Sequence, residues 1–122
     1  MRITRGTDVE RDTSPDENFS GPAERRAFGR AESLPAPLST FVVTFQDGSR
    51  TRWHRHAEGQ LLYILEGSGL VASRGESPVA VGPGDVVEAA PGEEHWHGAV
   101  AGGELSHVAL SFGETEWGEP ST

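Results

Sequence analysis

The stretch from Gln60 to Ser73, QLLYILEGSGLVAS, decides the fold class. Its first part is a nearly continuous apolar run, which is typical of a strand covered on both faces. A turn of Glu, Gly, Ser and Gly follows, and a second β-rich run begins at Leu70. This pattern predicts a hairpin of two buried strands.

Further short β-rich runs, separated by glycine- and proline-containing turns, lie on both sides of this hairpin. The expected strands cover residues 40–45, 52–56, 79–81, 85–89, 94–100 and 105–112. The chain contains 16 glycines and 8 prolines, which suits tight turns and disfavours long helices. Strands recur roughly every 8–12 residues and no helical period is maintained, so the sequence predicts an all-β sandwich or barrel.

The 122 residues suffice for one domain, which we divide into three parts. Residues 1–35 are polar and form an arm that is partly irregular, with a candidate edge strand over residues 25–30. Residues 36–112 carry the barrel. We expect the acidic tail, residues 113–122, to be loosely attached, with Trp117 as its anchor.

Composition narrows the classes of partner. Lysine and arginine together number 10 against 19 aspartates and glutamates, a net charge of −9. This acidity argues against nucleic acid and anionic membrane surfaces as partners, and no apolar run is long enough to span a membrane. The absence of cysteine excludes disulfides, thiolate metal sites and cysteine nucleophiles. We therefore expect a small-molecule substrate and, because no targeting segment is recognisable, a cytoplasmic location.

All five histidines lie in the β-rich half of the chain: His54, His56, His95, His97 and His107. Residues two apart on a strand share a face, so each His-x-His pair presents two imidazoles on one side. Gln60 has the same parity as the first pair if the intervening turn keeps the phase. Imidazoles from two strands and one oxygen donor would suit a first-row divalent metal ion. The alternative is two unrelated surface pairs.

Two longer patterns surround these pairs: Gly48-(x5)-His54-x-His56-(x3)-Gln60-(x6)-Gly67 and Gly84-Asp85-(x4)-Ala90-Pro91-Gly92-(x2)-His95-x-His97. They resemble the two signature motifs of the cupin superfamily, and the resemblance extends over residues 38–112. It implies an all-β, single-domain jelly-roll barrel with one divalent metal ion inside. It also implies which residues are the metal ligands: His54, His56, Gln60 and His95.

Gln60 departs from the usual cupin motif, which has glutamate at this position. Its amide oxygen is neutral, so three imidazoles and this amide would leave the double positive charge of the ion uncompensated. The ion should then bind less tightly and be a stronger Lewis acid. A metal-free cupin is the alternative. Ala90, where proline is usual, matters less because Pro91 follows directly.

A closer resemblance concerns the segments around Trp53–Gln60, Pro91–Ala99 and Ser106–Ala109. They are similar to small bacterial cupins with manganese-dependent hydroxynitrile lyase activity. This implies a lyase that cleaves cyanohydrins, manganese as the ion (with iron, nickel or zinc as alternatives), and His97 and His107 as acid–base residues. Structural roles for these two histidines remain open, as do other functions: a ferrous dioxygenase, a biosynthetic cyclase or isomerase, and a non-catalytic metal- or ligand-binding cupin.

Strand parity also separates inner from outer residues of the barrel. Val43, Phe45, Leu62 and Ile64 share the expected inward parity and would line the apolar part of a cavity. The outward parity of residues 60–65 gives an apolar stripe of Leu61, Tyr63 and Leu65. Together with the resemblance, this stripe predicts a homodimer that packs through a sheet face.

Overall fold

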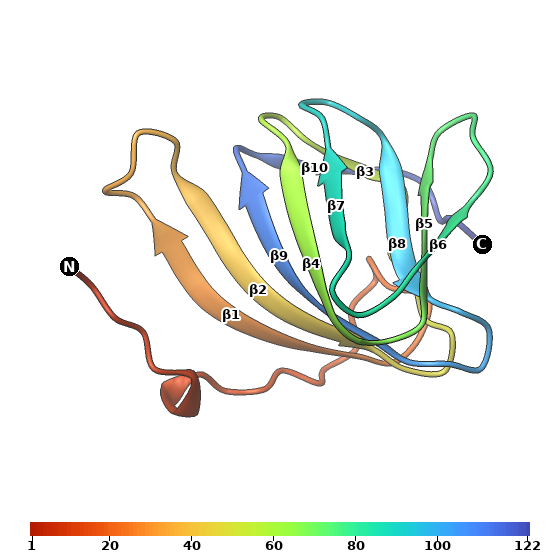
Figure 1. The fold of residues 1–122 in the computed structure, drawn as a ribbon, viewed down its shortest axis with the longest axis horizontal. Coiled ribbons are helices and arrows are strands. Elements are labelled where there is room, and N and C mark those ends of the chain that lie inside the picture. Colours follow the sequence, from red (N-terminus) through yellow and green to blue (C-terminus); the bar gives the residue numbers. More distant parts are fainter.

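The computed structural model describes residues 1–122 and contains ten strands in two antiparallel sheets (Figure 1). In order, the first sheet comprises β1 (Ala23–Ala31), β2 (Leu38–Phe45), β9 (Leu105–Phe112), β4 (Gln60–Gly67) and β7 (Val86–Ala89). The second comprises β10 (Thr115–Trp117), β3 (His54–His56), β8 (His95–Ala99), β5 (Gly69–Ser73) and β6 (Val79–Val81). Apart from one 3₁₀ turn, η1 (Gly6–Asp8), no helix is present. The predicted all-β jelly roll is confirmed.

Strands β4 and β9 of the first sheet alternate between buried and more exposed residues, as expected for a sheet with one covered face. Strand β9 does so without interruption, and its residues Leu105, His107, Ala109 and Ser111 are buried. Its register with β4 places His107 opposite Ile64. The inner face of this sheet therefore presents a histidine among apolar side chains.

The interior is divided into an apolar part and a polar part. The apolar part contains Phe45, Ile64 and Leu105, which are fully buried, and Val43 packs in the same cluster. Leu62 is also buried, so the inward orientation expected of Val43, Phe45, Leu62 and Ile64 is confirmed. The polar part contains all five histidines, and none is more than 6% exposed. A buried cluster of this kind needs partners for its nitrogen atoms.

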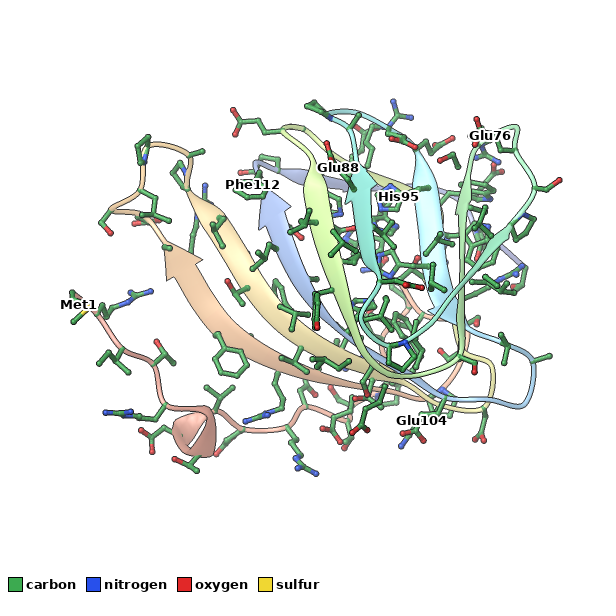
Figure 2. The ribbon with its side chains drawn as sticks, viewed as in Figure 1. Met1, Glu76, Glu88, His95, Glu104 and Phe112 are labelled. Atoms are coloured by element: carbon green, nitrogen blue, oxygen red, sulfur yellow. The ribbon has the colours of Figure 1, made fainter.

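The N-terminal arm runs along the first sheet before it enters strand β1, with Met1 at its outer end (Figure 2). Strand β1 pairs with β2 and forms the edge of that sheet. Isolated bridges join Asp12 to Arg25 and Phe19 to Thr51. The arm therefore contacts strand β1 and the segment before strand β3 through its backbone.

The C-terminal tail differs from our expectation of a loose attachment. Its strand β10 pairs with β3, so that Thr115 lies opposite His56 and Trp117 opposite His54. Strand β3 has β8 on one side only, and the tail supplies backbone partners on the other side. This strand was hard to predict from the sequence, because it is short and lies in an acidic segment.

One glycine follows the second histidine pair and permits a close backbone approach. A Cβ atom at Gly98 would lie 2.2 Å from the Cβ of Arg50, so no larger residue fits without displacing the neighbouring segment. The same segment passes Thr51, whose amide donates to the carbonyl of His97 over 3.0 Å. Gly98 thus lets the chain before strand β3 pack against the strand that carries His95 and His97.

No helix in the structure has the length and apolar character to cross a membrane.

Tyr63 and Leu65 of the apolar stripe are 46% and 40% exposed. The predicted homodimer and the predicted cytoplasmic location stay predictions.

Candidate metal centre

Four strands bring the predicted site residues together inside the barrel, where side chains from both sheets fill the interior (Figure 2). Strand β3 supplies His54 and His56, β4 supplies Gln60, β8 supplies His95 and His97, and β9 supplies His107. All six side chains are buried.

The rings of His54, His56 and His95 form a compact group. The centroid of the His54 ring lies 4.4 Å from that of His95 and 5.1 Å from that of His56. The centroids of His56 and His95 are 5.7 Å apart. The two motifs, in which Gln60 and His95 are 35 residues apart, therefore meet at one place.

Each of these three rings has an oxygen partner at Nδ1. His54 Nδ1 lies 2.9 Å from the carbonyl of Arg52, and His95 Nδ1 lies 2.9 Å from the carbonyl of Glu93. His56 Nδ1 lies 2.9 Å from the hydroxyl of Thr115. A ring that donates Nδ1–H is in the tautomer with a free lone pair on Nε2, which is the usual arrangement of metal-binding histidines.

Gln60 brings an oxygen atom to the same place. Its Oε1 lies 3.0 Å from His95 Nε2, while its amide nitrogen donates to the hydroxyl of Ser111 over 3.0 Å. With the hydrogen of His95 on Nδ1, both Nε2 and Oε1 are electron-pair donors with no hydrogen between them. In addition, His56 Nε2 is buried without a partner. A cation between these atoms would resolve both features, so the donor set fits a metal ion.

The three histidines of this group are uncharged at neutral pH. Burial, assisted by the charge of a protonated His95, lowers the pKa of His54 to about 3 and that of His56 to about 4. Burial also lowers the pKa of His95. Since metal ligands must be deprotonated, the neutral rings are ready to bind an ion without first losing a proton.

His97 and His107 form a pair of their own. Nε2 of His107 lies 3.0 Å from Nδ1 of His97, so the two rings share one hydrogen bond. Phe45 packs against both rings, with centroids 5.8 Å and 5.4 Å away. Burial lowers the pKa of His97 well below its usual value and that of His107 to about 4. The other nitrogen of each ring, Nε2 of His97 and Nδ1 of His107, has no partner.

His97 also belongs to a second group of donors. Nitrogen atoms of His54, His95 and His97 all lie within 4.8 Å of one another, so these three residues could hold a metal ion. The group shares His54 and His95 with the ligand set implied by the resemblance. It differs in using His97 in place of His56 and Gln60.

A cavity of about 460 Å³ connects Gln60 and every histidine of the cluster except His95 to the outside. Its polar side is lined by these histidines, Gln60 and Ser111, and by charged residues that include Asp16, Arg25, Arg30 and Glu114. The apolar side is formed by Phe19, Phe41, Val43, Phe45, Ala109 and Trp117. A concave cavity of this volume, with one apolar wall and polar groups opposite, can hold a small molecule.

Sequence reasoning did not identify Phe19, Thr115 and Trp117 as parts of this site. Phe19 and Trp117 line the cavity from the two ends of the chain. Trp117 packs on His54 with centroids 4.7 Å apart. Phe19 and Trp117 each stand among polar residues, which indicated that they pack against the barrel. The sequence did not indicate which part of the barrel they contact.

Comparison with known proteins agrees with this geometry. The family model of the cupin domain matches residues 41–111. The (R)-mandelonitrile lyase of Granulicella tundricola is 42% identical over 76 residues, which are 62% of this chain and 58% of that protein. The match thus spans less than two thirds of the length of this relative.

Among solved structures, a cupin-like protein from Thermotoga maritima superimposes with a TM-score of 0.84 at 33% identity, over 93% of this chain and 89% of that one. The polyketide cyclase RemF from Streptomyces resistomycificus has a TM-score of 0.77 at 18% identity, over 100% of this chain and 86% of that one, and shares the fold. With the family match, the barrel and the buried histidines, these similarities show that the chain belongs to the cupin domain family.

Proposed function

We propose that this cupin is a metal-dependent lyase of the hydroxynitrile type, which cleaves a small cyanohydrin into a carbonyl compound and hydrogen cyanide. The identity with a relative named (R)-mandelonitrile lyase supports the reaction class. The buried donor atoms described above support the use of a metal ion, for which we propose manganese.

In this proposal His54, His56, Gln60 and His95 hold the ion. When bound, it supplies a Lewis acid that stabilises negative charge developing on the substrate. The amide of Gln60 leaves more positive charge at the site than a carboxylate would. His97 is then not a ligand, and it can act as a base that its hydrogen-bond partner His107 orients.

The hydrogen-bonded pair of His97 and His107 is the observation that carries the proposal. Both rings are neutral at pH 7, because burial lowers the pKa of each, and Nε2 of His97 is without a partner. If Nδ1–H of His97 donates to Nε2 of His107, Nε2 of His97 is a base that His107 orients.

The proton and electron balance of the cleavage is simple. His97 accepts the hydroxyl proton of the cyanohydrin at Nε2, and the oxygen electrons form the carbonyl double bond. The carbon–carbon bond to the nitrile breaks with its electron pair on cyanide. Cyanide then takes the proton from His97 and leaves as hydrogen cyanide, which restores the neutral pair.

The apolar wall of the cavity would hold the carbon skeleton of the substrate. Phe41, Val43 and Phe45 line it together with His97 and His107. A cavity of about 460 Å³ admits a small organic molecule. These contacts would place the hydroxyl near the histidines and keep water away from the carbonyl product.

Elemental analysis followed by an activity assay tests the proposal. We expect the purified protein to bind one divalent ion per chain and to release cyanide from mandelonitrile in a manganese-dependent way. Metal binding without cyanide release would contradict the lyase function and favour a binding protein. Oxygen consumption with an organic substrate, when the protein is loaded with ferrous iron, would instead indicate a dioxygenase.

A further inference from the structure

The Nδ1 partner of His56 is unlike those of the other two histidines implied as ligands. His54 and His95 both reach a backbone carbonyl two residues earlier in the chain, at Arg52 and Glu93. His56 instead reaches the side-chain hydroxyl of Thr115, 59 residues later. Its orientation therefore depends on a residue outside the motif that contains it.

We propose that Thr115 is a positioning residue of the metal centre, holding His56 in the tautomer that offers Nε2 to the ion. This inference rests on the metal centre of the proposed function. It assigns a role to the C-terminal tail, which lies beyond residues 41–111 matched by the cupin family model.

The backbone of the tail fixes Thr115 at this place. Strand β10 pairs with β3 so that Thr115 is directly opposite His56. On one side, the amide of Ala57 donates to the carbonyl of Glu114 over 2.9 Å. On the other, the amide of Gly118 donates to the carbonyl of Trp53 over 2.7 Å. The hydroxyl is thus held between two anchored points of the chain.

A second residue of β10, Trp117, contacts the other histidine of β3. Trp117 lies opposite His54 in the same register, and its ring is tilted by 34° over that imidazole. The strand therefore contacts both histidines of β3, one through a hydroxyl and the other through an aromatic ring. Glu116, between them, points outward and its side chain is 77% exposed.

Loss of the hydroxyl would change what the His56 ring can do. The ring is buried, and Nε2 has no protein partner. Without an acceptor at Nδ1, a hydrogen there would be buried and unsatisfied, which is costly. The ring would no longer be held with its hydrogen on Nδ1, and the tautomer with hydrogen on Nε2 cannot bind a metal ion at that atom. Loss of such an outer partner typically weakens metal binding about 10–100-fold.

Three variants of the full chain separate this role from simple packing. Thr115→Val keeps the shape and removes the hydroxyl, Thr115→Ser keeps the hydroxyl, and Glu116→Ala is the control on the same strand. Manganese is titrated into each metal-free protein by calorimetry. We expect about 10–100-fold weaker binding for Thr115→Val, and the wild-type dissociation constant for Thr115→Ser and Glu116→Ala.

Nitrogen-15 NMR of the histidine rings provides a second readout that needs no metal. In the metal-free wild type we expect His56 to carry its hydrogen on Nδ1, and in Thr115→Val we expect this preference to be lost while the amide signals of β10 persist. Wild-type affinity in Thr115→Val would overturn the role of Thr115. So would Thr115→Ser binding as weakly as Thr115→Val, or hydrogen on Nε2 of wild-type His56.

These outcomes are distinguishable from failure of the proposed function. If the wild type binds no divalent ion, the proposed metal centre fails, and with it the proposed role of Thr115 in metal binding. If the wild type binds manganese but releases no cyanide, only the lyase proposal fails, and the affinities of the three variants still decide the role of Thr115.

Discussion

The two His-x-His pairs have the same spacing but lie in different surroundings. Strand β3 has three residues, and its central residue, Arg55, is exposed and pairs with Glu94 over 3.2 Å. Strand β8 has five residues, all buried, and Trp96, between its two histidines, is covered by the guanidinium of Arg50 at 4.2 Å. The first pair lies near an edge and the second in the middle of its sheet.

The hydrogen-bond partners at Nδ1 also differ between the two pairs. His54 and His56 both have an oxygen partner at Nδ1. In the second pair only His95 does, whereas Nδ1 of His97 is bonded to another histidine. The spacing of each motif therefore determines which face its residues share, whereas segments elsewhere in the chain supply the partners of His56 and His97.

The largest effect is expected when one of the two histidines that belong to both candidate groups of donors, His54 and His95, is removed. We expect His95→Ala to bind manganese hardly at all and to lose at least ~10³-fold in cyanide release, because a Lewis-acid ion contributes several kcal/mol. Metal content and activity are measured on the same preparation. A variant that kept both would show that the ion, if any, lies elsewhere.

Strand parity explains why so much of the polar interior could be predicted from the sequence. Residues two apart on a strand share a face whatever the rest of the chain does, so His54 with His56 and His95 with His97 followed directly. The apolar runs likewise indicated the strands that bury Leu62 and Ile64.

What the sequence did not predict depends on contacts between distant segments. Thr115 and Trp117 acquire a role only because β10 pairs with β3, and nothing local specifies that pairing. Phe19 reaches the cavity because the arm bridges to Thr51. The bond between His97 and His107 is also a matter of register, since it requires β8 and β9, in different sheets, to face each other.

A pair of matched substitutions asks whether the second histidine of each pair has a different task. We expect His97→Gln to keep its manganese but to lose about 10²–10⁴-fold in kcat/KM, as for loss of an acid–base group. His56→Gln should instead lose metal affinity, and its activity should recover in part at high manganese. Both proteins are compared by metal titration and by cyanide release.

The reverse result would be equally informative. If His97→Gln lost the ion while His56→Gln retained it, the ligands would be the alternative group of His54, His95 and His97. The proton transfer would then have to be assigned to another residue, and the contrast between the two pairs would disappear. His107→Gln is the matched control, because it alters the partner of His97 without removing a candidate ligand.

The smallest effect is expected for substitution of Gln60. Its amide oxygen lies beside His95 but not beside His97, so it distinguishes the two histidines. In Gln60→Glu a carboxylate would replace the amide, and the Ser111 hydroxyl, which now accepts from Gln60, could donate to it instead. We expect about tenfold tighter manganese binding, equivalent to about 1.4 kcal/mol, because the carboxylate compensates part of the charge of the ion.

The same compensation should reduce the Lewis acidity of the ion, so we expect cyanide release to fall although more metal is bound. Calorimetry gives the affinity, and the assay at saturating manganese gives the rate. Gln60→Leu, which removes the oxygen at nearly the same size, is the control and should weaken binding. Tighter binding of manganese by Gln60→Glu with an unchanged rate would mean that the neutral amide is not needed for the reaction. Unchanged affinity in both Gln60→Glu and Gln60→Leu would mean that residue 60 does not contact the ion.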